Sequence, residues 1–271
     1  MAWWYKNKKQ LKIGRSWKDD TGRHIQSSWI GWTDERKAAF DLTWRYGIDI
    51  INEIGVPDHI TINASAAIGT NLQTIFVNSW DKNIEKIYNV PNDITMSALT
   101  IPKGMNGNLV INIEGSVIGA SGLAGAINGG AGGAGGAAIS VASLGVTVNV
   151  SGSLLGGGGG GGSGGKGGNA INPHSGGKGG AGGRGQGYQL DAVNGAIGAI
   201  GRANAGAGGS GGNGAPYGAA GLPGKTGANG AITKGNSGGI AGAAGRAIIF
   251  KRISTYKIIE ISSGTISGAY S

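Results

Sequence analysis

The chain has 271 residues, of which 60 are glycine and none is cysteine, and its formal net charge is +9. The absence of cysteine excludes a disulfide-stapled fold, and no apolar stretch reaches the roughly 20 residues that a membrane-spanning helix needs. The N-terminal sequence MAWWYKNKKQ lacks the charged-then-apolar pattern of a secretory signal. We therefore expect no signal peptide.

Composition divides the chain into two parts. All seven tryptophans lie within the first 80 residues, whereas six of the 60 glycines precede residue 104. Residues 1–100 carry twelve basic and eleven acidic side chains, while residues 101–271 carry eleven basic and three acidic ones. The basic excess thus belongs to the glycine-rich part. It either favours an anionic partner or keeps soluble a surface with few other polar groups.

Residues 1–46 are predicted to form a Trp-rich head. Short strands are expected at Lys12–Trp17 and Gly22–Trp29, followed by a helix over Asp34–Phe40 with Thr33 as its N-cap. Six tryptophans in so short a segment either build a small aromatic core or present a docking surface for another subunit. The candidate attachment residues are Trp3, Trp4, Tyr5, Trp17, Trp29, Trp32 and Trp44.

Residues 47–118 form the next predicted region, a β-rich connecting domain in which apolar and polar side chains alternate. Residues 108–118 and 144–155 are alike: each is an alternating strand, then Gly-Ser, then two apolar residues, then glycine-rich sequence. They form an internal repeat with starts about 36 residues apart. A C-terminal β segment at 249–271 follows later and includes a turn at Gly-Thr-Ile-Ser-Gly. The strands expected before residue 104 are His59–Asn63, Leu72–Asn78, Ile84–Val90 and Ile94–Ile101.

Residues 119–248 are rich in glycine with a period of three, most clearly at Gly156–Gly168, which reads GGGGGGGSGGKGG. This period differs from the 3.6 of an α-helix and the 2 of a strand. It predicts polyglycine II helices, which have three residues per turn and must hydrogen-bond to one another. The alternative is a disordered linker, although apolar residues such as Ile139 and Ile248 punctuate the glycines. The predicted fold class is mostly β and irregular, with a sandwich of polyglycine II helices closed by the C-terminal β segment.

Four inserts interrupt the glycine-rich region. If the runs between them are rods, the inserts are loops at the ends of the rods, where recognition usually lies. The inserts are Asn169–Ser175, Tyr188–Ala205, Ala215–Tyr217 and Leu222–Ser237. The candidate receptor-binding residues in or beside them are Asn172, His174, Tyr188, Gln189, Leu190, Asp191, Arg202, Tyr217, Lys225 and Lys234.

Two resemblances extend this interpretation. Residues Gly14–Trp44, in which an acidic turn and a tryptophan precede TDERKAAFDLTW, resemble a short module of phage tail and tail-fibre proteins. Residues 90–270, with GSLLGGGGGGG, GGIAGAAGRAII and a final GTISGAY in that order, resemble the distal tail-fibre adhesins of T-even-type phages. That resemblance implies a polyglycine II sandwich, end loops that bind an outer-membrane receptor, and an N-terminal region attached to the fibre. Outside the glycines no receptor-contact residue is carried over.

Catalytic patterns are missing from the sequence. The three histidines are scattered, and the acidic residues after position 100 lie far apart. The stretch AAGLPGKT at 219–226 matches a relaxed phosphate loop, but the glycine-rich sequence after it cannot form the helix that such a loop requires. We therefore expect no enzyme activity, no cofactor, no metal site, no nucleic-acid partner and no insertion into a membrane.

These features together predict a virion protein at the tail or tail-fibre tip, made in the host cytoplasm. Its expected partners are other phage tail or fibre subunits and a bacterial outer-membrane protein or surface polysaccharide, which it binds through loops on the polyglycine II scaffold. The alternative is a purely structural tail-tip or adaptor protein in which the glycine-rich domain is a rigid spacer.

Overall fold

The computed structural model describes residues 5–6, 9–10, 59–65, 70–171, 174–251, 258–261 and 264–270. The chain divides into two compact units, Met1–Asp58 and His59–Ser271. In the first unit, β1 (Tyr5–Lys6) pairs antiparallel with β2 (Lys9–Gln10). The other elements predicted for the head, and its six tryptophans, lie outside the described residues.

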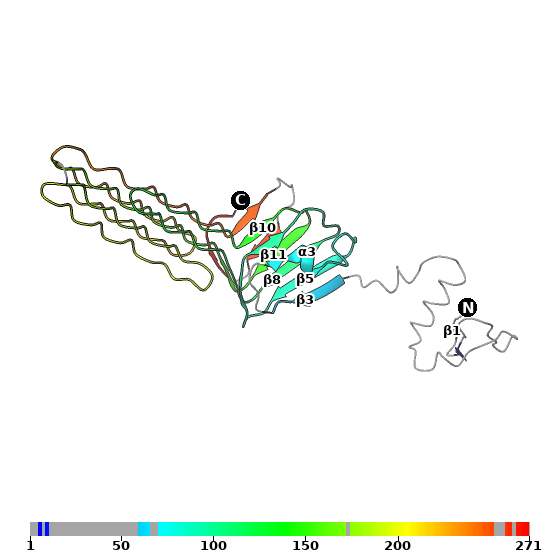
Figure 1. The fold of residues 1–271 in the computed structure, drawn as a ribbon. Coiled ribbons are helices and arrows are strands. Elements are labelled where there is room, and N and C mark those ends of the chain that lie inside the picture. The colour runs from blue at the N-terminus through cyan, green and yellow to red at the C-terminus, as the bar shows by residue number, and fades with distance from the viewer. Residues whose placement is uncertain are drawn as a thin grey trace. The chain divides into compact units, whose positions relative to one another are not determined.

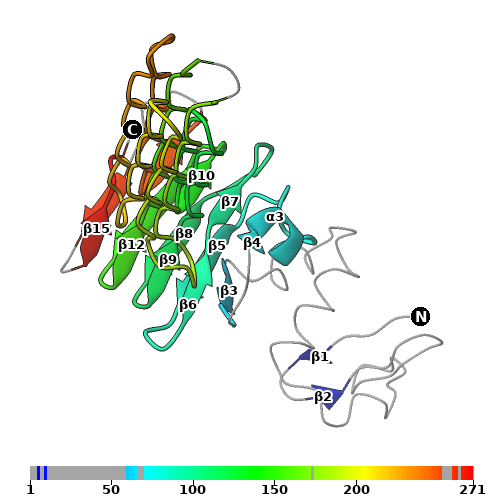
Figure 2. The ribbon, with the colours of Figure 1, turned by 60° about the vertical axis from the view of Figure 1, so that its left-hand side comes forward.

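The second unit contains a parallel β-helix. The chain visits three sheets in turn, so that successive circuits stack strands side by side (Figures 1 and 2). The strands are β3 (His59–Asn63), β4 (Thr70–Asn71), β5 (Glu85–Val90), β6 (Thr95–Ser97), β7 (Leu99–Ile101), β8 (Leu109–Ile113), β9 (Ser116–Ile118), β10 (Ile139–Val141), β11 (Val146–Val150), β12 (Ser153–Leu155), β13 (Ile248–Phe250), β14 (Ile258–Ile261) and β15 (Thr265–Ser267).

Every described pairing within these three sheets is parallel. The sheet orders are β14-β11-β8-β5-β3, β13-β10-β7-β4 and β15-β12-β9-β6. Leu109 of β8 lies beside Val146 of β11, so the internal repeat seen in the sequence corresponds to two neighbouring circuits. Inward residues of the alternating strands, such as Ile111 and Val148, are fully buried and form the hydrophobic core.

The strand predictions are confirmed for β3 and β5, and the predicted strand Ile94–Ile101 is divided into β6 and β7. The prediction for Leu72–Asn78 is wrong, because α3 (Leu72–Ile75) begins there. Asn71 caps α3 by accepting a hydrogen bond from the Gln73 N–H at 3.0 Å. The predicted C-terminal turn is also wrong, since its central residues form β15 beside β12. No helix in the described ranges is long and apolar enough to cross a membrane.

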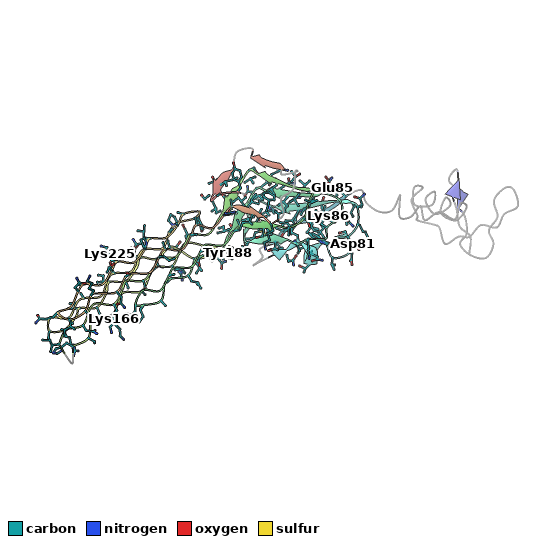
Figure 3. The ribbon with its side chains drawn as sticks, turned by 90° about the horizontal axis from the view of Figure 1, so that it is seen from above. Asp81, Glu85, Lys86, Lys166, Tyr188 and Lys225 are labelled. Atoms are coloured by element: carbon teal, nitrogen blue, oxygen red, sulfur yellow. The ribbon has the colours of Figure 1, made fainter. Side chains whose placement is uncertain are left out.

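Lys86 lies in an inward position of β5 and is fully buried. Its ammonium donates to the carbonyl oxygens of Lys82 (3.0 Å), Ile84 (3.1 Å) and Asn106 (2.6 Å). Burial lowers the pKa of Lys86, and the charge of Asp81 opposes that shift. Figure 3 shows this lysine in the part of the β-helix away from the glycine-rich runs. The three carbonyl contacts satisfy a charge that the core could not otherwise accept.

An asparagine ladder follows one face of the five-stranded sheet. The amide of Asn89 donates to Asn63 at 2.9 Å, that of Asn112 donates to Asn89 at 2.8 Å, and that of Asn149 donates to Asn112 at 2.8 Å. These residues are in register across β3, β5, β8 and β11. The ladder therefore fixes the stacking of four successive circuits.

The glycine-rich runs leave the β-helix at one of its corners and return there. Two runs are inserted between β9 and β10, and six between β12 and β13. The C-terminal strands consequently complete the sheets that the earlier strands begin. Figure 1 shows the runs lying side by side and extending away from the sheets. They are run 1 (119–126), run 2 (130–137), run 3 (156–169), run 4 (176–187), run 5 (191–201), run 6 (205–216), run 7 (219–230) and run 8 (234–246).

Run 3 lies at the centre of a ring of six other runs. Its backbone N–H groups donate in rotation to runs 2, 4 and 7, and its carbonyl groups accept in rotation from runs 1, 6 and 8. Hydrogen bonds also close the ring in the order 1, 2, 8, 7, 6, 4, and run 5 lies outside it against runs 4 and 6. For example, successive N–H groups of residues 160, 161 and 162 donate to Gly133 (2.9 Å), Gly183 (2.7 Å) and Leu222 (3.0 Å).

This central position explains the unbroken glycines of run 3. A Cβ at Gly160, Gly161 or Gly162 would lie 1.9, 1.9 or 2.1 Å from a carbonyl oxygen of run 1, run 6 or run 8, respectively. Real Cβ atoms essentially never approach within 3.0 Å. Every side-chain direction is therefore occupied by a neighbouring backbone, and only glycine fits.

Candidate functional site

The turns of the glycine-rich region gather at two ends. We call the end next to the β-helix proximal and the opposite end distal. Residues 170–171 and 174–175 and the turns at 202–204 and 231–233 lie at the distal end, whereas turns at 188–190 and 217–218 lie at the proximal end. The short hairpin of runs 1 and 2 turns at 127–129, level with the middle of run 3.

Backbone hydrogen bonds join the three distal turns into one surface. The Ala231 N–H donates to the Asn204 carbonyl at 3.1 Å, and the Ile232 N–H donates to the Asn169 carbonyl at 3.0 Å. The hydroxyl of Thr233 accepts from the Asn169 N–H at 2.7 Å. These bonds join residues that are far apart in the sequence. The distal turns therefore form one surface, which we call the distal tip.

The distal tip carries a depression of about 290 Å³. Two large apolar side chains are exposed on its turns, Ile171 at 71% and Ile232 at 63%. Ala203 and Asn204 have positive φ angles of 37° and 67°, which are uncommon for residues other than glycine. The depression is lined by Ala170, Ile171, His174, Ala203, Asn204 and Ala231.

Eight of the ten predicted binding residues lie at the two ends, three at or beside the distal tip and five at the proximal end. His174 and Arg202 lie at the distal tip, and Lys234 directly follows one of its turns. Asn172 lies outside the described residues. Lys225 is exposed along run 7, away from both ends (Figure 3). The remaining predicted residues lie at the proximal end and are Tyr188, Gln189, Leu190, Asp191 and Tyr217.

The insert Tyr188–Ala205 is mostly a run rather than a loop. Within it, Val193, Ala196 and Ala199 donate backbone hydrogen bonds to run 4, at 2.8, 2.8 and 2.7 Å, so residues 191–201 form run 5. Gly195, Gly198 and Gly201 keep the period of three. This spacing of glycines is the sequence signal for a run. The apolar residues between the glycines make the segment look like a loop.

Leu222–Ser237 likewise consists of most of run 7, a short turn and the start of run 8. Sequence reasoning thus missed Ala203, Asn204 and Ile232 as parts of the distal tip. No residue pattern in the sequence distinguishes these turn residues from the runs beside them.

Charge is distributed unevenly along the runs. Asp191 is the one acidic residue between Glu114 and Glu260, and it lies at the proximal end. Among the described residues, no three His, Asp or Glu side chains gather in a way that could hold a metal ion. The basic residues on the distal half of the runs and at the tip are Lys166, Lys178, Arg202, Lys225 and Lys234.

A β-helix thus carries a densely hydrogen-bonded glycine-rich body, and three turns are bonded into one small surface at the distal end of that body. A family model described as phage tail fibre adhesin Gp38 matches residues 55–271. The chain belongs to this family of phage tail fibre adhesins.

The solved structures include one similar chain, from the crystal structure of the gp37–gp38 adhesin tip complex of the bacteriophage S16 long tail fiber. The two chains are 20% identical, the alignment covers 83% of this chain and 88% of that one, and the TM-score is 0.42. A comparison with curated proteins gave no match.

Membership of the family confirms three predictions. The protein is a tail-fibre component of the virion, it binds a receptor on the bacterial host, and it is an adhesin rather than an enzyme. The matched region begins at residue 55, so the Trp-rich head lies before it.

Proposed function

We propose that the adhesin contacts its bacterial receptor with the distal tip, at the end of the tail fibre. The observation that supports this most strongly is the bonding of three separate turns into one surface with exposed Ile171 and Ile232 and a depression beside His174. Exposed apolar groups beside a concave site are typical of recognition surfaces. Arg202 and Lys234 belong to the proposed contact surface, and Asn172 is proposed as a further contact residue.

We also propose that the runs are polyglycine II helices arranged as a sandwich. Two features support this assignment: the hydrogen-bond partners of run 3 rotate with a period of three, and all of them belong to other runs. A polyproline-II-type helix has three residues per turn and no hydrogen bonds of its own, so its backbone must pair with neighbours.

The proposed mechanism is rigid presentation. Each distal turn is held at both ends by runs that are bonded to several neighbours. Little conformational entropy is then lost when a receptor orders the turn, which favours affinity. The basic residues of the distal half would increase the rate of encounter with an anionic bacterial surface.

For the rest of the chain we propose the domain organisation expected from the sequence. Residues 1–46 would be the attachment head, 47–118 the connecting domain, 119–248 the polyglycine II domain and 249–271 the C-terminal β segment, with β10, β11 and β12 of the third region contributed to the sheets of the β-helix. The head would dock on another tail or fibre subunit through its aromatic residues, because tryptophan and tyrosine are favoured anchors in interfaces.

Adsorption to host cells tests the proposed receptor surface. The full-length chain is labelled and titrated onto the bacterium on which the phage grows. Ile232→Ser is compared with Ile240→Ser, whose target is a similarly exposed isoleucine on run 8, away from the tip. We expect at least a tenfold loss of affinity for Ile232→Ser, which corresponds to about 1.4 kcal/mol, and an unchanged value for Ile240→Ser.

The structural alternative makes a different prediction. If the glycine-rich domain is a spacer, both serine variants and a variant with the distal turn 231–233 replaced by glycines would bind cells as the parent does. Equal binding by all of them would overturn the assignment of the receptor surface to the distal tip.

A further inference from the structure

The proximal end carries a second group of polar and aromatic side chains, which the distal tip does not use. We define the proximal cluster as Arg184, Tyr188, Gln189, Asp191 and Tyr217. Its members come from the end of run 4, the following turn, the start of run 5 and the turn after run 6. Figure 3 shows Tyr188 where the runs meet the β-helix, far from the distal end.

Contacts bring these side chains together. The hydroxyl of Tyr217 lies 3.5 Å from the Gly187 carbonyl oxygen, to which it donates. The side-chain amide of Gln189 donates to the Tyr188 hydroxyl at 3.2 Å. Burial raises the pKa of Tyr217, and the charge of Asp191 raises it further. A phenol is protonated at neutral pH even without such a shift, so the Tyr217 hydroxyl can donate.

Several features exceed what a connecting turn needs. Gln189 has a φ of 56°, a conformation in which glycine or asparagine would be less strained. Gln189 and Asp191 are exposed, and Leu190 is 40% exposed beside them. The strained backbone and the exposed hydrogen-bonding groups at one place point to a ligand.

We propose that the proximal cluster binds a neutral, hydroxyl-rich saccharide of the bacterial surface. Amide, carboxylate and phenol groups can donate to and accept from sugar hydroxyls, and the tyrosine rings and Leu190 offer apolar area to the C–H face of a sugar ring. Sugar binding would make this a second contact with the host, beside the receptor surface of the distal tip.

Charge selects a neutral sugar over an acidic one. Asp191, the one acidic residue of the whole glycine-rich body, lies here. The carboxylate of Asp191 would repel a phosphate or a sugar acid. No acidic side chain accompanies the lysines of the distal half, so an anionic ligand would not be repelled there. The guanidinium of Arg184 donates a hydrogen bond from Nη2 to the backbone carbonyl of Asp191 at 3.4 Å. The inference does not depend on which residues of the distal tip contact a receptor.

Saturation-transfer NMR and calorimetry with the full-length protein test the proposal. The probes are neutral oligosaccharides released from the lipopolysaccharide and, separately, from the capsule of the host, with a phosphorylated core oligosaccharide as the acidic comparison. We expect saturation transfer to at least one neutral probe. Tyr188→Ala and Asp191→Asn should each weaken binding about tenfold or more, and the matched control Tyr270→Ala, at an exposed tyrosine of the β-helix, should bind as the parent.

Two further variants separate binding from folding. Tyr188→Phe keeps the ring and removes the hydroxyl, so it should retain part of the affinity that Tyr188→Ala loses. Ile232→Ser alters the distal tip and should bind the neutral probes as the parent does, even if adsorption fails. No transfer to any neutral probe, stronger binding of the phosphorylated probe, or parental affinity in Tyr188→Ala with an unchanged melting temperature would each overturn the proposal.

Discussion

Replacing Gly161 by alanine tests the packing around run 3. The added methyl would lie 1.9 Å from the Gly212 carbonyl oxygen of run 6, where real contacts exceed 3.0 Å. Runs 3 and 6 would therefore have to separate by more than 1 Å, as these two distances require. Hydrogen bonds from residues 209, 212 and 215 to run 3, now 2.8–2.9 Å long, would then become too long to form.

The cost follows from those lost bonds. Three backbone hydrogen bonds at about 1 kcal/mol each give a destabilisation of about 3 kcal/mol, and the carbonyl groups left buried and unpaired add to it. In a unit of this size, 3 kcal/mol lowers the melting temperature by about 6–12 °C. Lys166→Ala is the control in the same run, because position 166 already carries a Cβ where run 1 has ended, so that the variant leaves the backbone packing as it is. It should change the melting temperature by less than about 2 °C.

Differential scanning calorimetry of the full-length chain measures both variants, and limited proteolysis shows whether the glycine-rich region opens first. A melting temperature for Gly161→Ala within about 2 °C of the parent would refute the packing argument, because that value would mean that the runs separate at no cost.

Two further predictions concern the β-helix. Asn112→Ala removes the middle of the asparagine ladder, where Asn112 donates to Asn89 and accepts from Asn149. We expect the free energy of unfolding, measured by urea denaturation, to fall by about 2 kcal/mol. An unchanged free energy of unfolding would show that the ladder does not stabilise the stacked circuits. Lys86→Met keeps the volume but leaves three carbonyl oxygens without their donor, and we expect it to cost about 3 kcal/mol. A stability equal to the parent's would mean that the buried charge costs as much as its hydrogen bonds contribute.

The fraction of glycine in a run depends on how many other runs surround it. The sequence alone predicts the positions of the runs only in part. Run 3 is surrounded on every side and is glycine at nearly every position, whereas run 7, on the outside, has glycine at every third position, 221, 224, 227 and 230. Consecutive glycines show the period of three plainly in run 3. Runs 5 and 7 have one glycine per turn, and the residues between their glycines give them the composition of loops, so the sequence predicts loops there.

The non-glycine residues of run 3 follow the same rule. Gly157 and Gly160 face run 1, and a Cβ on either would lie within 2 Å of its carbonyl oxygens. Ser163 and Lys166 continue that row where run 1 ends, and the Ser163 hydroxyl accepts from the Gly129 N–H at 2.8 Å. Run 3 therefore contains residues other than glycine where its neighbour, run 1, has ended. The local sequence of run 3 does not show where run 1 ends.

The alternation of apolar and polar residues predicted most strands of the β-helix, because each strand has one face in the core. It could not predict α3, since Leu72, Phe76 and Trp80 are apolar at a spacing of four in a segment too short for helical periodicity to be distinguished. Which turns meet at the distal tip depends on the directions and lengths of all eight runs. Local sequence patterns therefore could not predict that the expected binding residues are divided between two ends, with Lys225 at neither of them.

Hydrogen–deuterium exchange of the full-length adhesin, with and without outer-membrane vesicles of its host, tests the central claim most directly. We predict that bound vesicles slow exchange at the distal end, in residues 169–171, 174–175, 202–205 and 231–233, more than in any other described turn. Slower exchange confined to the β-helix, with no change at the distal turns, would contradict the assignment of the receptor surface to the distal tip.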